Sequence, residues 1–417
     1  MILFTGAKTR LILILCCLPL FGCLSSRSEP TVTVETLPAA DPPAEPPPYT
    51  DREVDGVSFT PEKLSAVTIP DHVGRVSGRD AGAEPDGGAR IGGIFRAAYR
   101  EALMREMPLE GVLGVDEAHL WPEKTRLCWV QNWRGASLSF NNSWGIAGLT
   151  LAVLNTAGDR VFTVSGDILD MYGKSLGTGG ENGVAGYGTP LTDVFFMKFT
   201  DRTAPVCAQR FTKGLIYVDS MGKGAFIAGK APSGTVENDE TAGFYPTDDA
   251  ELRQRLKSAF GRAYRGLIDR HDRPVKADGP VEYSDFNGIV WSIETGEGAF
   301  SVAGLYVQQY DGGEFTVALP VLAGREGDGK TGVFSFLEDA RTIEPPLSAI
   351  VNGNIRLPGA REITPHPLDE HGKKLVFLKS LALYGIPLTD SFVNIETMVL
   401  SQRFSNGVFR VSILRDR

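Results

Sequence analysis

The sequence has little of the chemistry on which metal sites and most catalytic centres depend. It contains five histidines and five cysteines in 417 residues. No two histidines have metal-ligand spacing on a recognisable helix, so we predict neither a metal site nor a cofactor. Positive charge is also short, with 42 Lys and Arg against 51 Asp and Glu and a formal net charge of −9. Without a basic surplus to displace counterions, we expect no nucleic-acid partner.

The first 22 residues have the pattern of an export signal. Lys8 and Arg10 precede the apolar run Leu11–Leu20, which is too short to span a bilayer. The run ends in Leu20-Phe21-Gly22-Cys23, which resembles the lipobox of bacterial lipoproteins. The resemblance implies cleavage before Cys23, acylation of Cys23 and attachment to a membrane. An ordinary secretory signal that is cut nearby is the alternative.

Residues 23–54 are rich in Ser, Thr, Glu and Pro and cannot bury enough apolar surface to fold. We therefore predict a disordered tether between the lipid anchor and a folded body. Leu24 stands where lipoproteins retained at the inner membrane usually carry aspartate. The resemblance thus implies the outer membrane if the source has two membranes, and otherwise the outer face of the cell membrane.

The body contains an internal duplication. The segment Tyr187–Asp193 returns as Tyr384–Asp390 with six of seven residues identical, and Gln-Arg-Phe-x-x-Gly follows each copy, at Gln209 and at Gln402. Upstream, the segments 95–105 and 260–270 align as amphipathic helices, with an aromatic or apolar residue at every fourth position. We predict two homologous halves, residues 55–240 and 241–417.

The predicted fold class is α+β, each half combining short antiparallel strands and hairpins with one or two amphipathic helices. Alternating or β-branched stretches flank the Gln-Arg-Phe-x-x-Gly elements, which indicates a strand, a glycine turn and a second strand. We expect Gln209 and Gln402 to hydrogen-bond buried backbone at the turn. We expect Asp193 and Asp390 to bond nearby backbone amides.

The run from Tyr187 through Gln209-Arg-Phe-Thr-Lys-Gly-Leu-Ile-Tyr217 to Gly229 resembles the LGFP repeat of bacterial secreted proteins. The resemblance implies a binding or spacer module in the cell envelope and carries over Phe211, Gly214, Ile216, Tyr217, Phe404 and Gly407. Aromatic rings that are exposed can stack on sugar faces. The candidate ligand-binding residues are Trp129, Trp133, Tyr187, Phe211, Tyr217, Tyr384 and Phe404. Core packing is the alternative role.

Two further features concern chemistry. Cys128 and Cys207 are the only cysteines of the body, and an oxidising compartment would allow a disulfide between them, although sequence alone leaves the pairing open. Residues 324–331 spell a P-loop pattern and residues 173–177 spell Gly-x-Ser-x-Gly. The first pattern is followed by a poor helix start, and the second is preceded by a helical stretch and followed by a loop, so we predict loops and no catalytic residue.

These observations together favour a non-catalytic envelope lipoprotein that binds or scaffolds at the cell surface, with peptidoglycan or another glycan as ligand. Two alternatives stay open. One is an envelope hydrolase whose site lies between the halves, and the other is a subunit that binds another envelope protein. Convergent carboxylates in a deep pocket would favour the hydrolase, and a large exposed apolar patch would favour the protein partner.

Overall fold

The computed structural model describes most of the body of the chain. The described residues are 56–412 without 63–68, 77–86, 106, 108, 113–118, 123–126, 136–148, 156–157, 175–185, 198, 200–204, 220, 230–244, 272–274, 285–290, 296–297, 323–338, 353–379, 382 and 396. Cys23, the tether, Ser175 and the pattern at 324–331 lie outside this range. Among the described residues, no helix is long and apolar enough to cross a membrane.

The first half begins with a 3-10 turn, Asp71–Gly74, and helix α2, Gly87–Met104. An antiparallel sheet follows, with β3 beside β4 and the order β2-β4-β5-β6, and its strands are β2 Leu109–Val112, β3 His119–Pro122, β4 Leu127–Gly135, β5 Leu149–Leu154 and β6 Val161–Ser165. Helix α3, Gly166–Lys174, leads to a second sheet ordered β10-β9-β8-β7, made of β7 Phe195–Met197, β8 Val206–Phe211, β9 Gly214–Val218 and β10 Gly224–Ala228.

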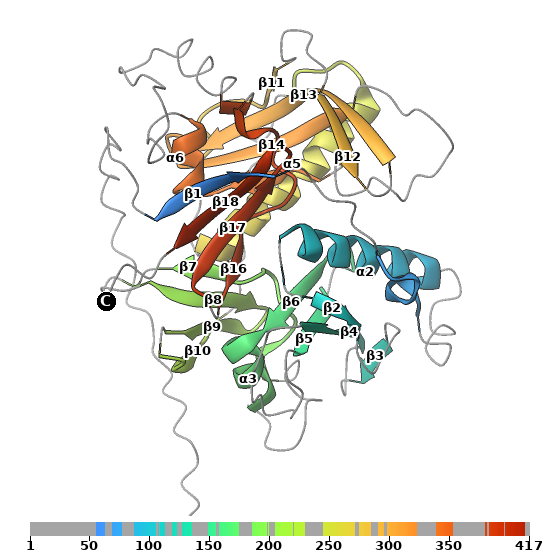
Figure 1. Cartoon of the computed structure of the whole chain (residues 1–417), viewed down its shortest axis with the longest axis vertical. Helices are drawn as coiled ribbons and strands as arrows, with labels where there is room; N and C mark the ends of the chain where they lie inside the picture. Colours follow the sequence, from blue (N-terminus) through green and yellow to red (C-terminus); the bar gives the residue numbers. More distant parts are fainter. Residues whose placement is uncertain are drawn as a thin grey trace, which may run out of the picture. The chain divides into compact units, whose positions relative to one another are not determined.

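The second half repeats this succession (Figure 1). Helix α5, Ala250–His271, precedes a sheet ordered β11-β13-β14-β15 with β12 beside β13, made of β11 Glu282–Ser284, β12 Trp291–Thr295, β13 Gly298–Tyr310, β14 Phe315–Leu322 and β15 Arg341–Ile343. Helix α6, Leu347–Val351, is followed by β16 Phe392–Asn394, β17 Val399–Phe404 and β18 Gly407–Ser412. The fold is therefore α+β, built from short antiparallel strands and hairpins.

The last sheet is completed by the first strand of the described chain, β1, Val57–Pro61. β1 pairs with β18 so that Pro61 lies opposite Gly407, just as Ala228 of β10 lies opposite Gly214 in the first half. A Cβ atom at Gly407 would lie 2.6 Å from the ring of Phe59, and one at Gly214 would lie 2.6 Å from the ring of Phe226. Glycine is required at both turns because a backbone carbonyl oxygen, of Ile227 or Thr60, lies even closer than the ring, at 2.2 and 2.3 Å. Although the first half was expected to begin at residue 55, β1 belongs to the sheet of the second.

The two halves share a hydrophobic core. One cluster of buried side chains takes Phe211 and Val218 from the first half and Phe404 and Phe409 from the second. Within α5, Phe260, Tyr264 and Ile268 are buried at every fourth position, as the apolar spacing predicts. The backbone amides of Glu251 and Leu252 donate to Asp249 Oδ1, so Asp249 caps this helix.

Candidate functional site

The aromatic residues that were expected to contact a glycan form core instead. Of the seven candidates, Tyr187 is half-buried, and the other six are at most 7% exposed, namely Trp129, Trp133, Phe211, Tyr217, Tyr384 and Phe404. The ring of Tyr187 lies 4.6 Å from that of Phe226, edge to face. Stacking on a sugar needs an open ring face. The prediction of sugar stacking by the six buried residues is therefore wrong, and core packing is their role.

The two cysteines of the body do not pair. Cys128 and Cys207 are buried thiols that form no disulfide. Cys207 Sγ lies 3.4 Å from Met398 Sδ, while Cys128 Sγ contacts the carbonyl oxygens of Trp129 and Leu154. Burial raises the pKa of Cys207 to about 12, which keeps it a protonated thiol at neutral pH. The proposed disulfide is thus absent, and both residues act as small apolar side chains of the core.

The repeated motif forms the same buried hydrogen bonds in both halves. Gln209 Nε2 donates to the carbonyl oxygens of Thr163 and Thr192, each at 2.8 Å. In the second half, Gln402 Nε2 donates to the carbonyl oxygens of Thr342 and Thr389, at 3.0 and 2.8 Å. The expected bonding of both glutamines to buried backbone is confirmed. Each glutamine ties the last strand of the first sheet, β6 or β15, to the motif.

The motif aspartates also reach these strands. The backbone amide of Thr163 donates to Asp193 Oδ1 at 3.1 Å, and that of Thr342 donates to Asp390 Oδ1 at 2.8 Å. The amides are 30 and 48 positions away in the chain, not in the local turn that the sequence suggested. The second carboxylate oxygen of each aspartate is thereby directed toward arginines.

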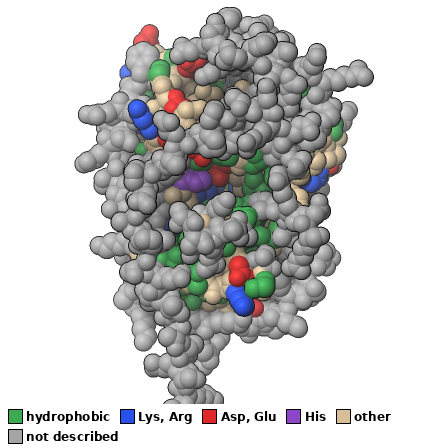
Figure 2. Space-filling model, turned by 90° about the vertical axis from the view of Figure 1, so that its left-hand side faces the viewer, with side chains coloured by type: hydrophobic (Ala, Val, Ile, Leu, Met, Phe, Trp, Pro, Cys, Tyr) green, Lys and Arg blue, Asp and Glu red, His purple; other side chains and the backbone are tan. Residues whose placement is uncertain are grey.

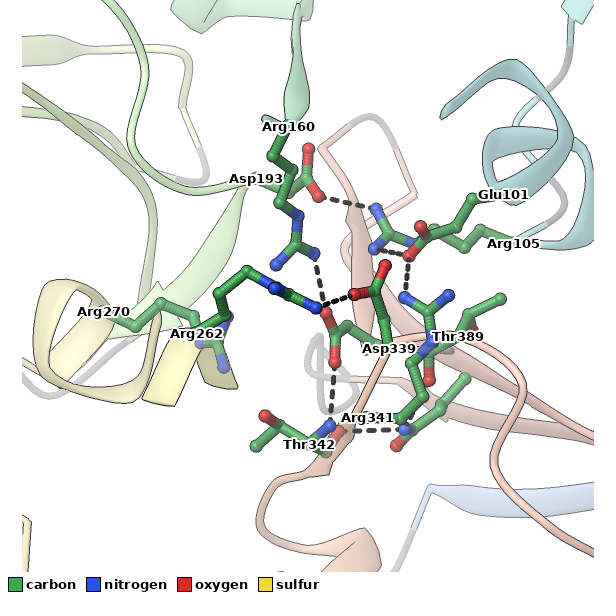
Figure 3. Close-up of polar contacts among 12 residues, drawn as sticks. Glu101, Arg105, Arg160, Asp193, Arg262, Arg270, Asp339, Arg341, Thr342 and Thr389 are labelled. Atoms are coloured by element: carbon green, nitrogen blue, oxygen red, sulfur yellow. Dashed lines mark hydrogen bonds and ion pairs between the residues drawn. The ribbon is translucent and has the colours of Figure 1, made fainter. Parts of the chain in front are cut away.

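These arginines and aspartates belong to a buried charge network (Figure 3). Arg105 Nη1, just beyond α2, donates to Asp193 Oδ2 at 2.7 Å, and its other terminal nitrogen pairs with Glu101. Arg160 Nη2 donates to Asp390 Oδ2 at 2.7 Å, and Arg341 Nη1 lies 3.1 Å from Glu101 Oε1. The last two pairs each join one half to the other, so the network lies at their boundary.

Three largely buried carboxylates at this boundary, Asp193, Asp390 and Glu344, are held ionised. Burial alone would raise the pKa of Asp193, but Arg105 and Arg160 more than offset it and hold the pKa below the ordinary value. The same balance, set mainly by Arg160 and Arg341, lowers the pKa of Asp390. Glu344 follows the pattern, because Arg270 lies 2.5 Å from it. These carboxylates remain charged well below neutral pH.

A cavity adjoins the network between α2 and the start of β6. Its volume is about 80 Å³ and its polar lining includes Glu101, Arg105, Arg160, Asp193 and Arg341. Ligand pockets usually hold at least about 300 Å³, so this space admits water molecules but not a sugar ring. Glycoside hydrolysis also needs one carboxyl group with a raised pKa. The arrangement stabilises charge by pairing and offers no such general acid.

A second set of contacts links the halves at the ends of the two long helices. Arg403 Nε of β17 donates to the carbonyl oxygen of Met104, at the end of α2, at 3.4 Å. Arg210 Nε of β8 donates to the carbonyl oxygen of Asp269, near the end of α5, at 3.2 Å. Cations stabilise the carboxyl end of a helix. The hairpin of each half therefore caps the helix of the other.

Sequence reasoning did not find this network, although two aligned pairs of charged residues were visible in the duplication. Asp193 aligns with Asp390, and Arg105 aligns with Arg270. A charged residue kept at matched positions of two copies is a signal for a shared buried role. Arg160 and Arg341 gave no such signal. Within the part of the chain that the structure describes, no group of His, Cys, Asp and Glu side chains could hold a metal ion.

Comparison with known proteins adds no family. The chain matches no model of a protein family, and no curated protein matches it. The likeness to the LGFP repeat thus remains a prediction from the residues quoted above.

Proposed function

We propose that this protein is a lipid-anchored envelope protein that binds a glycan of the cell surface without catalysis. The lipobox-like sequence at Cys23 and the tether that follows support the location. The observation that carries the non-catalytic role is the pairing of the convergent carboxylates. Asp193 and Asp390 each bind an arginine at 2.7 Å and have lowered pKa values, whereas a hydrolase needs a protonated acid and room for substrate.

The alternative of a protein partner has less support. The large hydrophobic side chains that are exposed among the described residues are Met221, Tyr283 and Leu383, which lie on three separate segments. On the face shown in Figure 2, the hydrophobic side chains of described residues are visible as several separate groups. A protein docking site usually presents a contiguous apolar patch. No described segment gathers these three residues into one.

Co-sedimentation tests the proposed binding. The full chain, extracted in detergent, is incubated with purified peptidoglycan sacculi, and the supernatant is analysed for released muropeptides. We expect saturable binding and no released fragments. Released fragments would overturn the non-catalytic role, and an absence of binding would overturn peptidoglycan as the ligand.

Metabolic labelling tests the anchor. We expect a fatty-acid probe to be incorporated into the wild-type protein and lost in Cys23→Ser. The matched control is Cys16→Ser, because Cys16 lacks the preceding small residue and lies in the segment that we expect to be removed. Unchanged labelling of Cys23→Ser would exclude Cys23 as the acylated residue.

A further inference from the structure

Helix α5 has a strongly basic solvent face in an acidic protein. Its exposed charged residues are one acid, Glu251, and five cations, Arg253, Arg255, Lys257, Arg262 and Arg265. The whole chain carries a net charge of −9. The exposed surface of α5 therefore has a local excess of positive charge, opposite in sign to the net charge of the chain.

Arg255, Arg262 and Arg265 lie on one side of the helix, because 3.6 residues per turn place them within about 80° of one another around its axis, whereas Arg253 and Lys257 project from other sides. At a rise of about 1.5 Å per residue, Arg255 and Arg265 are roughly 15 Å apart along α5. The opposite side of the helix is buried through Leu256, Phe260 and Leu267. Arg262 is paired with Asp339 at 2.7 Å, but both side chains are nearly half exposed, and exposed pairs contribute little. A ligand anion could replace Asp339 there at small cost.

The equivalent helix of the first half has no such face. When Phe95 is aligned with Phe260, the five basic positions of α5 correspond to Gly88, Arg90, Gly92, Ala97 and Arg100 of α2. Among these, Arg100 is buried and Arg90 donates to the carbonyl oxygen of Gly158 at 2.7 Å. The duplicated fold therefore forms this helix without a row of exposed cations, so stability does not require the basic face of α5.

We propose that the solvent face of α5 binds a linear, negatively charged glycan of the cell envelope. This inference rests on the proposed function and names its ligand class. Six of the aromatic candidates are buried, so charge is the recognition chemistry that the surface of the body retains. A row of three arginines about 15 Å long matches a chain of regularly spaced carboxylates or phosphates. A membrane surface fits less well, because no large apolar side chain is exposed on α5 for insertion.

The test measures binding of the full chain, in detergent, to polygalacturonate, with dextran as the neutral polymer. We compare wild type with Arg255→Glu/Arg265→Glu. The control is Lys213→Glu/Lys223→Glu, which makes the same charge change at exposed residues beside the hairpins of the first half. We expect the α5 variant to bind at least tenfold more weakly, the control to stay within twofold of wild type, and wild-type affinity to fall as salt rises.

Several results would overturn the inference: no wild-type binding, equal losses in both variants, or binding to vesicles of anionic lipid but not to the polymer. Arg255→Gln/Arg265→Gln, which introduces no acid, should show a smaller loss in the same direction, and circular dichroism checks that each variant folds. Sacculi separate this inference from the proposed function. If wild type and the α5 variant sediment equally with sacculi, the glycan role stands and the α5 site fails.

Discussion

The two halves have the same residues where side chains hydrogen-bond buried backbone groups, and they differ in the positions of their charged residues. Gln131 and Gln308 show the agreement, since each accepts a hydrogen bond from the aromatic residue two positions on and donates to a distant carbonyl oxygen. Gln209 and Gln402 repeat it at the hairpins. Buried backbone groups must be bonded in any copy of the fold. Those side chains are therefore fixed by the architecture.

The charged positions follow another logic. Arg105 binds the motif aspartate of its own half, Asp193, whereas the aligned Arg270 binds Glu344. Asp390 is instead paired with Arg160 from the first half. Once two copies share one chain, their facing charges can change independently, provided that each buried ion keeps a partner. The comparison teaches that divergence is concentrated at the boundary and on the surface of the long helices.

The largest expected effect comes from removing a motif charge. Asp390→Asn should lower the free energy of unfolding by about 3–5 kcal/mol, because it removes the buried counter-ion of Arg160. Asp193→Asn should lower it less, since Arg105 keeps Glu101 as a second partner. Urea denaturation of the full chain measures both. Equal losses of stability in the two variants would contradict the prediction that the second partner of Arg105, Glu101, compensates for the loss of Asp193.

The next effect concerns the two covering rings. Phe59 lies 5.0 Å from the ring of Tyr384, and Phe226 lies 4.6 Å from that of Tyr187. Because both rings are only partly buried, each Phe→Ala change should destabilise by about 2–3 kcal/mol, below the range for fully buried rings. Met221→Ala, at an exposed side chain, is the control. A Phe59→Ala variant as stable as this control would contradict the equivalence of β1 and β10.

Matched glutamine variants sharpen the comparison. Gln209→Leu and Gln402→Leu each remove two hydrogen bonds and leave buried carbonyl oxygens with fewer partners. We expect losses of about 2 kcal/mol, equal between the halves. Thermal and urea unfolding of the two variants provide the measurement. A difference of more than about 1 kcal/mol between the two variants would mean that the glutamine of one motif contributes more to the free energy of unfolding than that of the other.

The smallest effect near neutrality is that of pH. Asp193, Asp390 and Glu344 have lowered pKa values in the folded protein, so their stabilisation is complete above the unfolded-state pKa of about 4 and is lost as pH falls below it. Unfolding free energy should change little between pH 7 and 5 on their account and then decline. The decline should be shallower in Asp390→Asn. Parallel curves for wild type and variant would contradict the assignment.

The sequence was sufficient for the fold class and for the roles of the repeated glutamines. Both depend on local patterns, such as the glycine turn after Phe211 and the apolar spacing around Phe260, which tertiary contacts did not override. The duplication predicted the two related halves, because residues that are identical in both copies of a motif mark the positions that the fold requires.

The charge network and the exposure of the aromatic residues could not be predicted. Arg341 and Glu101 are 240 positions apart, and Arg160 and Asp390 are 230 apart, so only the folded chain brings them together. The identity of Trp133 and Tyr384 as aromatic residues is compatible both with a buried position and with an exposed one. The sequence does not show which face of a sheet is covered, so both roles stay open. In the structure, both side chains are buried in the core.

The pairing of β1 with β18 makes closure of the last sheet depend on residues that lie far apart in the chain. Thr60 and Arg410 are hydrogen-bonded across 350 positions, so β1 cannot pair until β18 has been synthesised. A chain truncated before Gly407 lacks β18 and leaves β1 as an open edge strand. The strand β1 thus makes the integrity of this sheet depend on residues at both ends of the described body.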